Sequence, residues 1–77
     1  MTLHELGVKL KEMRDSAPEG EIAVYTHLFG IKYADEIVRS HYSIKDIVIA
    51  AGIDESMKTE VRKGINLAKY VELKHVP

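Results

Sequence analysis

The sequence SIKDIVIAAGIDESMKTEV, residues 43–61, decides the fold expected for this chain. Ser43 is followed three residues later by Asp46, a pattern that predicts a capped helix start. The apolar residues that follow recur at helical spacing, and Gly52 predicts the end of this helix because glycine enters the left-handed conformation at little cost. One of residues 54–56 then caps a second helix. We therefore expect two helices joined by a tight glycine turn.

The second helix of this pair is predicted to bury one apolar stripe, made of Met57, Val61, Ile65, Ala68 and Val71. Gly64 interrupts the stripe and marks a point where the helix can break, because glycine costs about 1 kcal/mol relative to alanine inside a helix. Residues 71–76, VELKHV, alternate apolar and polar side chains. That alternation suits either a short strand or a frayed tail.

Upstream of this pair, the chain predicts three more helices. Thr2 and Glu5 form the pattern of a capping box, so a first helix should begin there and run to about Asp15. After a turn, a second helix is expected to end at Gly30, for the same reason that Gly52 ends its helix. The apolar residues of 31–38 restart the helical period and predict a short third helix.

Length and composition agree with a small helical domain. The 77 residues are 45% hydrophobic and 30% charged, which is the composition of a folded globular protein. We therefore predict one all-α domain over residues 1–77, with four to five short helices and a C-terminal tail or short strand. Eleven Lys and Arg stand against twelve Asp and Glu, so no overall positive charge draws the chain to nucleic acid.

Several function classes are not expected. The chain has no cysteine, which excludes disulfides and cysteine-containing zinc sites. The four histidines, His4, His27, His41 and His75, do not follow the spacing of a zinc motif, so we expect no metal and no other cofactor. No nucleophile motif is present and a small domain has little room for a walled pocket, so we do not expect an enzyme. Without a membrane-spanning or signal segment, the expected location is the cytoplasm.

Residues 43–61 resemble the helix-turn-helix headpiece of lactose-repressor-like regulators. The resemblance implies that Gly52 is the turn glycine and that the second helix is a recognition helix, which enters the major groove of DNA. It also implies a small core for the helix pair. In that core, Ile47, Ala51 and Ile53 pack between the two helices and Val61 anchors the second one.

Two positions depart from that headpiece. Val48 stands where the family has a small residue, and Lys58 stands where it has an apolar one. Met57 is expected to take over the packing of that apolar residue, which would rotate the helix. Through HLFGIKYADEI (27–37) and TEVRKGINLAKYVEL (59–73), the chain is also similar to small bacterial proteins described as helix-turn-helix-like domains. That second resemblance implies a fold and no activity.

The candidate DNA-binding residues are those that the helix pair would present to a duplex. Arg62 can make a bidentate contact to guanine, and lysines suit phosphates. Glu55 and Glu60 oppose binding, because each would lie in the negative field of DNA. Residues 44–77 contain six basic and five acidic side chains. The candidate residues are Lys45, Ser56, Lys58, Thr59, Arg62, Lys63 and Asn66.

Two functions from different classes therefore remain. The first is a small bacterial DNA-binding transcriptional regulator that binds double-stranded DNA, as a homodimer formed by the first helix or residues 31–38. The alternative is a protein–protein interaction or homo-oligomerisation module without DNA binding. Basic residues in one patch clear of Glu55 and Glu60 would favour DNA, whereas acids interleaved among them would favour protein contact.

Overall fold

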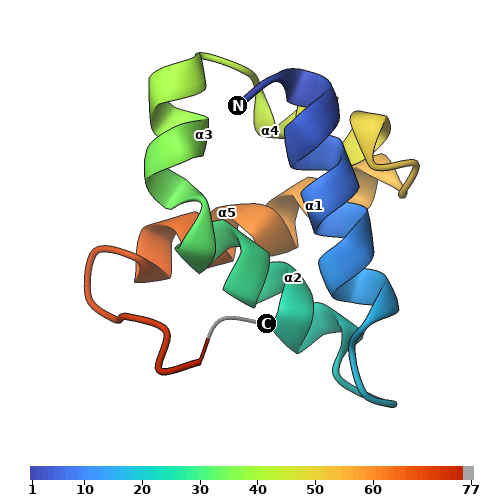
Figure 1. The fold of residues 1–77 in the computed structure, drawn as a ribbon, viewed down its shortest axis with the longest axis vertical. Coiled ribbons are helices and arrows are strands. Elements are labelled where there is room, and N and C mark those ends of the chain that lie inside the picture. Colours follow the sequence, from blue (N-terminus) through green and yellow to red (C-terminus); the bar gives the residue numbers. More distant parts are fainter. Residues whose placement is uncertain (76–77) are drawn as a thin grey trace.

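The computed structural model describes residues 1–75, and all of their regular secondary structure is helical. The α-helices are α1 (Leu3–Asp15), α2 (Ile22–Lys32), α3 (Ala34–Ser40), α4 (Ile44–Ala50) and α5 (Lys58–Leu67), with a short 3-10 helix, η1 (Glu55–Met57), before α5 (Figure 1). The all-α prediction is confirmed. Within the described part of the chain the alternating segment forms no strand, and residue 76 of that segment lies outside the described residues.

The first helix begins as its sequence predicts. The hydroxyl of Thr2 accepts a hydrogen bond from the backbone N–H of Glu5 at 3.1 Å, and the Glu5 carboxylate accepts one from the Thr2 N–H at 2.9 Å. This capping box satisfies two N–H groups that the helix itself cannot pair. The helix then runs to Asp15 and buries Leu6 and Leu10 completely.

One hydrophobic core joins the helices. α2 packs against both α1 and α5, and α1 also packs against α4 (Figure 1). Thr26 is fully buried in α2, and its hydroxyl accepts a hydrogen bond from Arg14 and donates one to the carbonyl of Ile22. Burial of this polar group is therefore compensated. The buried core residues are Leu6, Leu10, Met13, Phe29, Ile37, Ile44, Ile47, Val48, Ala51 and Val61.

Gly30 and Gly64 do not end or break helices, so both sequence predictions for them are wrong. α2 continues through Gly30 to Lys32, and α5 continues through Gly64 to Leu67. The two glycines face each other where α2 crosses α5, and a Cβ atom added to either would lie 2.9 Å from the Cα of the other. Each glycine is therefore needed for the close approach of two backbones, which overrides its weak helix propensity.

The third helix lies further along the chain than predicted. Since α2 extends to Lys32, α3 covers Ala34–Ser40 rather than residues 31–38. Its end is set by His41, which adopts a left-handed conformation with a φ of 65°. No sequence pattern indicates this end, because glycine and asparagine, rather than histidine, are the residues usual at such a position.

The predicted helix pair is present as α4, a tight turn and α5. Ser43 caps α4 by accepting a hydrogen bond from the Asp46 N–H at 3.0 Å. Gly52 has a φ of 74°, as its role in the turn requires. Of the three candidates for the second cap, Asp54 is the one whose carboxylate accepts the N–H of Ser56.

Most of the residues expected to form the core of this helix pair are buried or packed against the core. Ile47, Ala51 and Val61 are buried, and Ile53 packs against the core. Lys58 is exposed and Met57 packs against the core in its place, as predicted. Val48 is fully buried. The prediction that Val71 extends the buried stripe is wrong, because α5 ends at Leu67 and Val71 is exposed.

Candidate nucleic-acid interface

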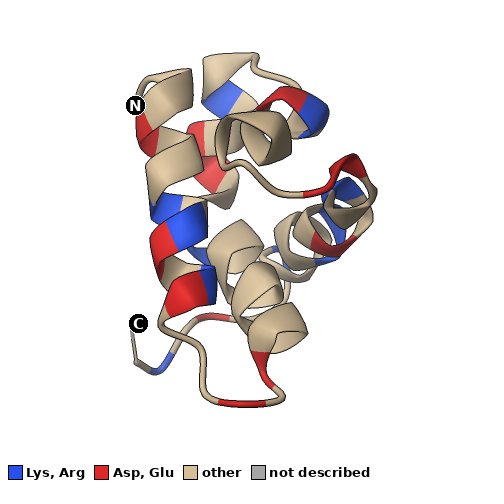
Figure 2. Ribbon diagram, turned by 90° about the vertical axis from the view of Figure 1, so that its right-hand side faces the viewer, with Lys and Arg blue, Asp and Glu red and all other residues tan. Residues whose placement is uncertain are grey.

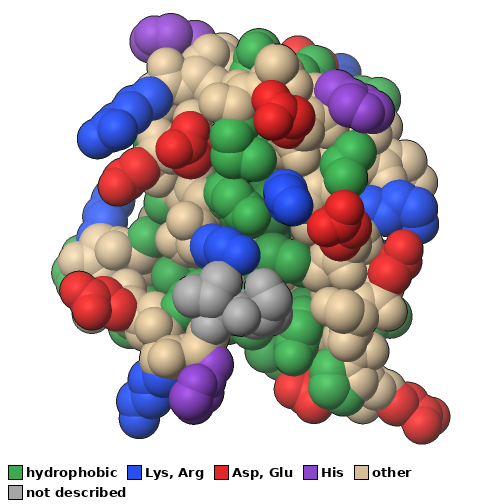
Figure 3. Space-filling view, in the orientation of Figure 1, with side chains coloured by type: hydrophobic (Ala, Val, Ile, Leu, Met, Phe, Trp, Pro, Cys, Tyr) green, Lys and Arg blue, Asp and Glu red, His purple; other side chains and the backbone are tan. Residues whose placement is uncertain are grey.

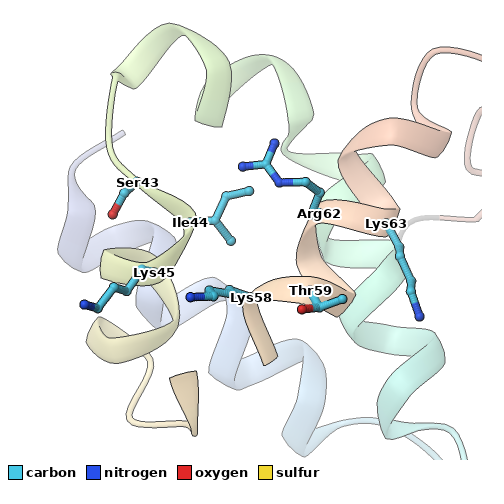
Figure 4. A pocket seen from close by; sticks show the side chains of 7 residues that line it. All are labelled: Ser43, Ile44, Lys45, Lys58, Thr59, Arg62 and Lys63. Carbon is cyan, nitrogen blue, oxygen red and sulfur yellow. The ribbon is translucent and has the colours of Figure 1, made fainter. Parts of the chain in front are cut away.

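A groove of about 440 Å³ lies between α4 and α5 (Figure 4). Its lining residues come from the start of α4 and from the first two turns of α5. Five of the seven candidate DNA-binding residues line it, namely Lys45, Lys58, Thr59, Arg62 and Lys63. The remaining lining residues are Ser43 and Ile44, which the sequence indicated only as a cap and a core residue. The fold therefore gathers most of the predicted site in one place.

The other two candidates lie outside this groove. Ser56 is exposed in η1, where its backbone N–H is bonded to Asp54. Asn66 lies one turn beyond Arg62 and Lys63 and lines a second, shallow hollow, which shares Lys63 with the groove and also includes His27, Leu67 and Tyr70. Neither residue contributes to the cationic groove.

The exposed face of α5 follows from its buried one. Val61 and Gly64 are buried against the molecule, so residues a half-turn away must face solvent. Thr59, Lys63 and Asn66 lie at i, i+4 and i+7 and share the middle of that exposed face. Figure 4 shows the Lys58 side chain extending toward α4 and the Lys63 side chain pointing away from it. The groove thus receives cations from both α4 and α5.

Three of the four groove cations have acidic partners. One oxygen of Glu55 lies 3.8 Å from the Lys45 ammonium and 3.3 Å from that of Lys58. Lys63 lies 3.1 Å from Glu60. Arg62 has no ion-pair partner among residues 1–75. Basic and acidic segments accordingly alternate along α4, η1 and α5 (Figure 2).

Glu60 is bound to the body of the molecule. Its carboxylate contacts the imidazole Nε2 of His27 on α2, and its side chain is 25% exposed. Hydrogen bonds from His27 and then Lys63 hold the pKa of Glu60 below its ordinary value of 4.5, because both bonds favour the ionised carboxylate. This pair lies 33 residues apart in sequence, and no local pattern signals it. Glu60 is one of the two acids predicted to oppose DNA, and its carboxylate is held against α2 by the contact with His27.

The described residues show neither a metal site nor a membrane helix. Across residues 1–75, histidine and acidic side chains form no group of three that could hold a metal ion. No helix in that same part of the chain combines the length and the apolar character needed to cross a bilayer.

Comparison with known proteins supports the fold. A family model described as an HTH-like domain matches residues 2–74, nearly the whole chain. No curated protein and no solved structure matches the chain.

Proposed function

The chain belongs to the family of HTH-like domains, and on that premise we propose that it binds double-stranded DNA through the groove between α4 and α5. One observation carries the proposal. Four cations from two helices, Lys45, Lys58, Arg62 and Lys63, line a single groove, and no acidic residue is among its lining residues. Such a convergence suits the phosphates of a duplex backbone.

The contacts are assigned from the chemistry of the side chains. α5 serves as the recognition helix, and Arg62 offers a planar fork of donors that matches the O6 and N7 atoms of guanine. The lysines act as point charges toward phosphates, and the hydroxyls of Ser43 and Thr59 donate to phosphate oxygens. The protein would act as a small bacterial transcriptional regulator in the cytoplasm, with two copies on one site.

The acidic partners reduce the positive charge of the groove without cancelling it. The four groove cations exceed the two acids that contact them by two, although the whole chain carries a net charge of −1. Ion pairs between exposed side chains contribute only about 0.2–1 kcal/mol, so a lysine can exchange its carboxylate for a phosphate. Binding of moderate strength and marked salt dependence is the expected result.

Fluorescence anisotropy with a random-sequence duplex tests this proposal. Two to four phosphate contacts predict that affinity falls by about one to two decades between about 50 and 200 mM salt. Arg62→Ala should weaken binding, whereas Arg39→Ala, which removes the same exposed side chain from α3, should not. Absence of binding by the wild-type protein at the lower salt concentration would reject DNA as the partner.

A second candidate function rests on a different surface. His27, Leu67 and Tyr70 line a hollow of about 390 Å³ with Lys63 and Asn66, and Tyr70 is 84% exposed. Exposed aromatic and aliphatic side chains beside polar ones are typical of protein interfaces. Figure 3 shows a face of the molecule on which hydrophobic side chains gather at the centre, with basic side chains among them and further charged ones around them. An interaction or homo-oligomerisation module would use such surfaces, and sedimentation equilibrium would reveal self-association.

A further inference from the structure

The carboxylate of Glu55 occupies the point where two lysines from different helices converge. Lys45 belongs to α4 and Lys58 to α5, and the tight turn between them brings both ammonium groups to the same oxygen, at 3.8 and 3.3 Å. Glu55 itself is the first residue of η1, whose start is fixed by the hydrogen bond from Ser56 to Asp54. The structure therefore already contains an anion held by two cations at the edge of the groove.

A phosphate of the DNA backbone has the chemistry to take that place. Like a carboxylate, a phosphodiester carries one negative charge on oxygens that accept from lysine, and lysine binds either as a point charge. The side chains of Lys45, Glu55 and Lys58 are 54%, 48% and 48% exposed, so a phosphate can reach both ammonium groups. The hydroxyls of Ser43 and Thr59 line the same groove and can donate to its oxygens.

We infer that the position between Lys45 and Lys58 is a backbone-phosphate site and that Glu55 competes with the phosphate for it. The inference rests on the proposed DNA-binding function and adds an internal inhibitor to it. Removal of the Glu55 charge should strengthen DNA binding, because both lysines then become available at once. The competition is partial, since an exposed ion pair is weak.

The test compares Glu55→Gln with the wild-type protein by fluorescence anisotropy, using a random-sequence duplex of about 20 base pairs at several salt concentrations. We expect affinity to rise about two- to fivefold, the equivalent of one exposed ion pair. The slope of log affinity against log salt should steepen by about one, because another phosphate contact forms. Thermal unfolding monitored by circular dichroism verifies that each variant is folded.

Two further variants separate competition from simple charge repulsion. Asp46→Asn removes the same charge from α4, where Asp46 has no ion pair among the described residues, and should give a smaller gain and an unchanged slope. In a Lys45→Ala/Lys58→Ala background, the gain from Glu55→Gln should fall to the level of Asp46→Asn. The inference is overturned if Glu55→Gln gives no gain, or if its full gain persists without the two lysines.

Failure of the inference differs from failure of the proposed function. If the wild-type protein binds the duplex and Glu55→Gln does not improve binding, only the competition is rejected. If neither protein binds at about 50 mM salt, the proposed function is rejected and the phosphate site with it. Binding by Glu55→Gln alone would support the competition at the position between Lys45 and Lys58, but it would reject DNA as the partner of the wild-type protein.

Discussion

The two glycines at the crossing of α2 and α5 show how single residues set the position of the proposed recognition helix. With hydrogen as its side chain, Gly64 allows the α5 backbone to contact the backbone of α2 at Gly30. A larger residue must move one helix, because the atoms in the way belong to backbone and cannot rotate aside. The position of α5 against α2, and with it the orientation of the groove between α4 and α5, therefore depends on glycine at position 64, which has no Cβ atom.

We predict that Gly64→Ala destabilises the protein although alanine is the better helix former. Overpacking should lower the free energy of unfolding by about 1–3 kcal/mol, measured by urea denaturation. Asn66→Ala in the same helix is the matched control, because Asn66 is exposed. That control should be neutral or stabilising by about 0.5 kcal/mol. Equal or greater stability of Gly64→Ala would show that the helices do not approach so closely.

The pair formed by Glu60 and His27 predicts a dependence of stability on pH. Because its pKa lies below 4.5 in the folded protein, Glu60 binds a proton less readily when folded than when unfolded. Its contribution to stability is therefore present above about pH 4.5 and is lost as the pH falls through the folded pKa.

The measurement is the melting temperature of the wild-type protein and of Glu60→Gln between about pH 6 and pH 3. We expect the wild-type protein to be more stable near pH 6 and the difference to shrink on acidification. A difference that stays constant over the range would mean that the Glu60 carboxylate has no favourable partner in the folded state.

At the scale of the elements, the helix starts were predictable because each depends on residues close in sequence. The hydroxyls of Thr2 and Ser43 accept the N–H three residues ahead, and both starts were predicted. The ends near Gly30 and Gly64 were not, because these glycines serve contacts between α2 and α5 that a local pattern does not contain. When the packing partner of a helix is unknown, a glycine in a helical segment indicates only low helix propensity or the end of the helix.

The hydrogen bond that caps α4 leads to a prediction about the stability of the protein. Ser43→Ala removes the acceptor for the Asp46 N–H and should lower the free energy of unfolding by about 0.5–2 kcal/mol. Thr59→Ala serves as the control, because the Thr59 side chain is exposed and makes no hydrogen bond with the described residues. Chemical denaturation of both variants measures the two effects. Equal losses for Ser43→Ala and Thr59→Ala would show that the Ser43 hydroxyl does not act as a cap.

At the scale of the whole molecule, five of the seven candidates named from the sequence line one groove, but the charge balance of that groove was not predicted. Five candidates were predictable as a group because they lie on the exposed faces of two helices that a short turn connects. The pairing of these residues with acids was not predictable from the sequence. Glu60 is drawn to His27 on α2, a contact that only the packed fold creates, whereas Glu55 is drawn between Lys45 and Lys58 by the geometry of the turn.

This arrangement meets the condition that we associated with protein contact from the sequence, because Glu55 and Glu60 contact three of the four groove cations. Neither acid is among the residues that line the groove between α4 and α5, and this observation supports the proposal of DNA binding. Four cations line the groove, and the two acids that contact three of them lie outside its lining. The proposal of DNA binding therefore rests on these four groove cations rather than on the net charge of the chain.

Backbone amide chemical shifts, followed by NMR while a duplex is added at about 50 mM salt, test the central claim most directly. We predict that the largest changes fall on the residues that line the groove, on both α4 and α5, and that α1 changes little. Largest changes around His27, Leu67 and Tyr70 instead, or no change on any residue at this salt concentration, would contradict the assignment of the groove between α4 and α5 as the DNA-binding site.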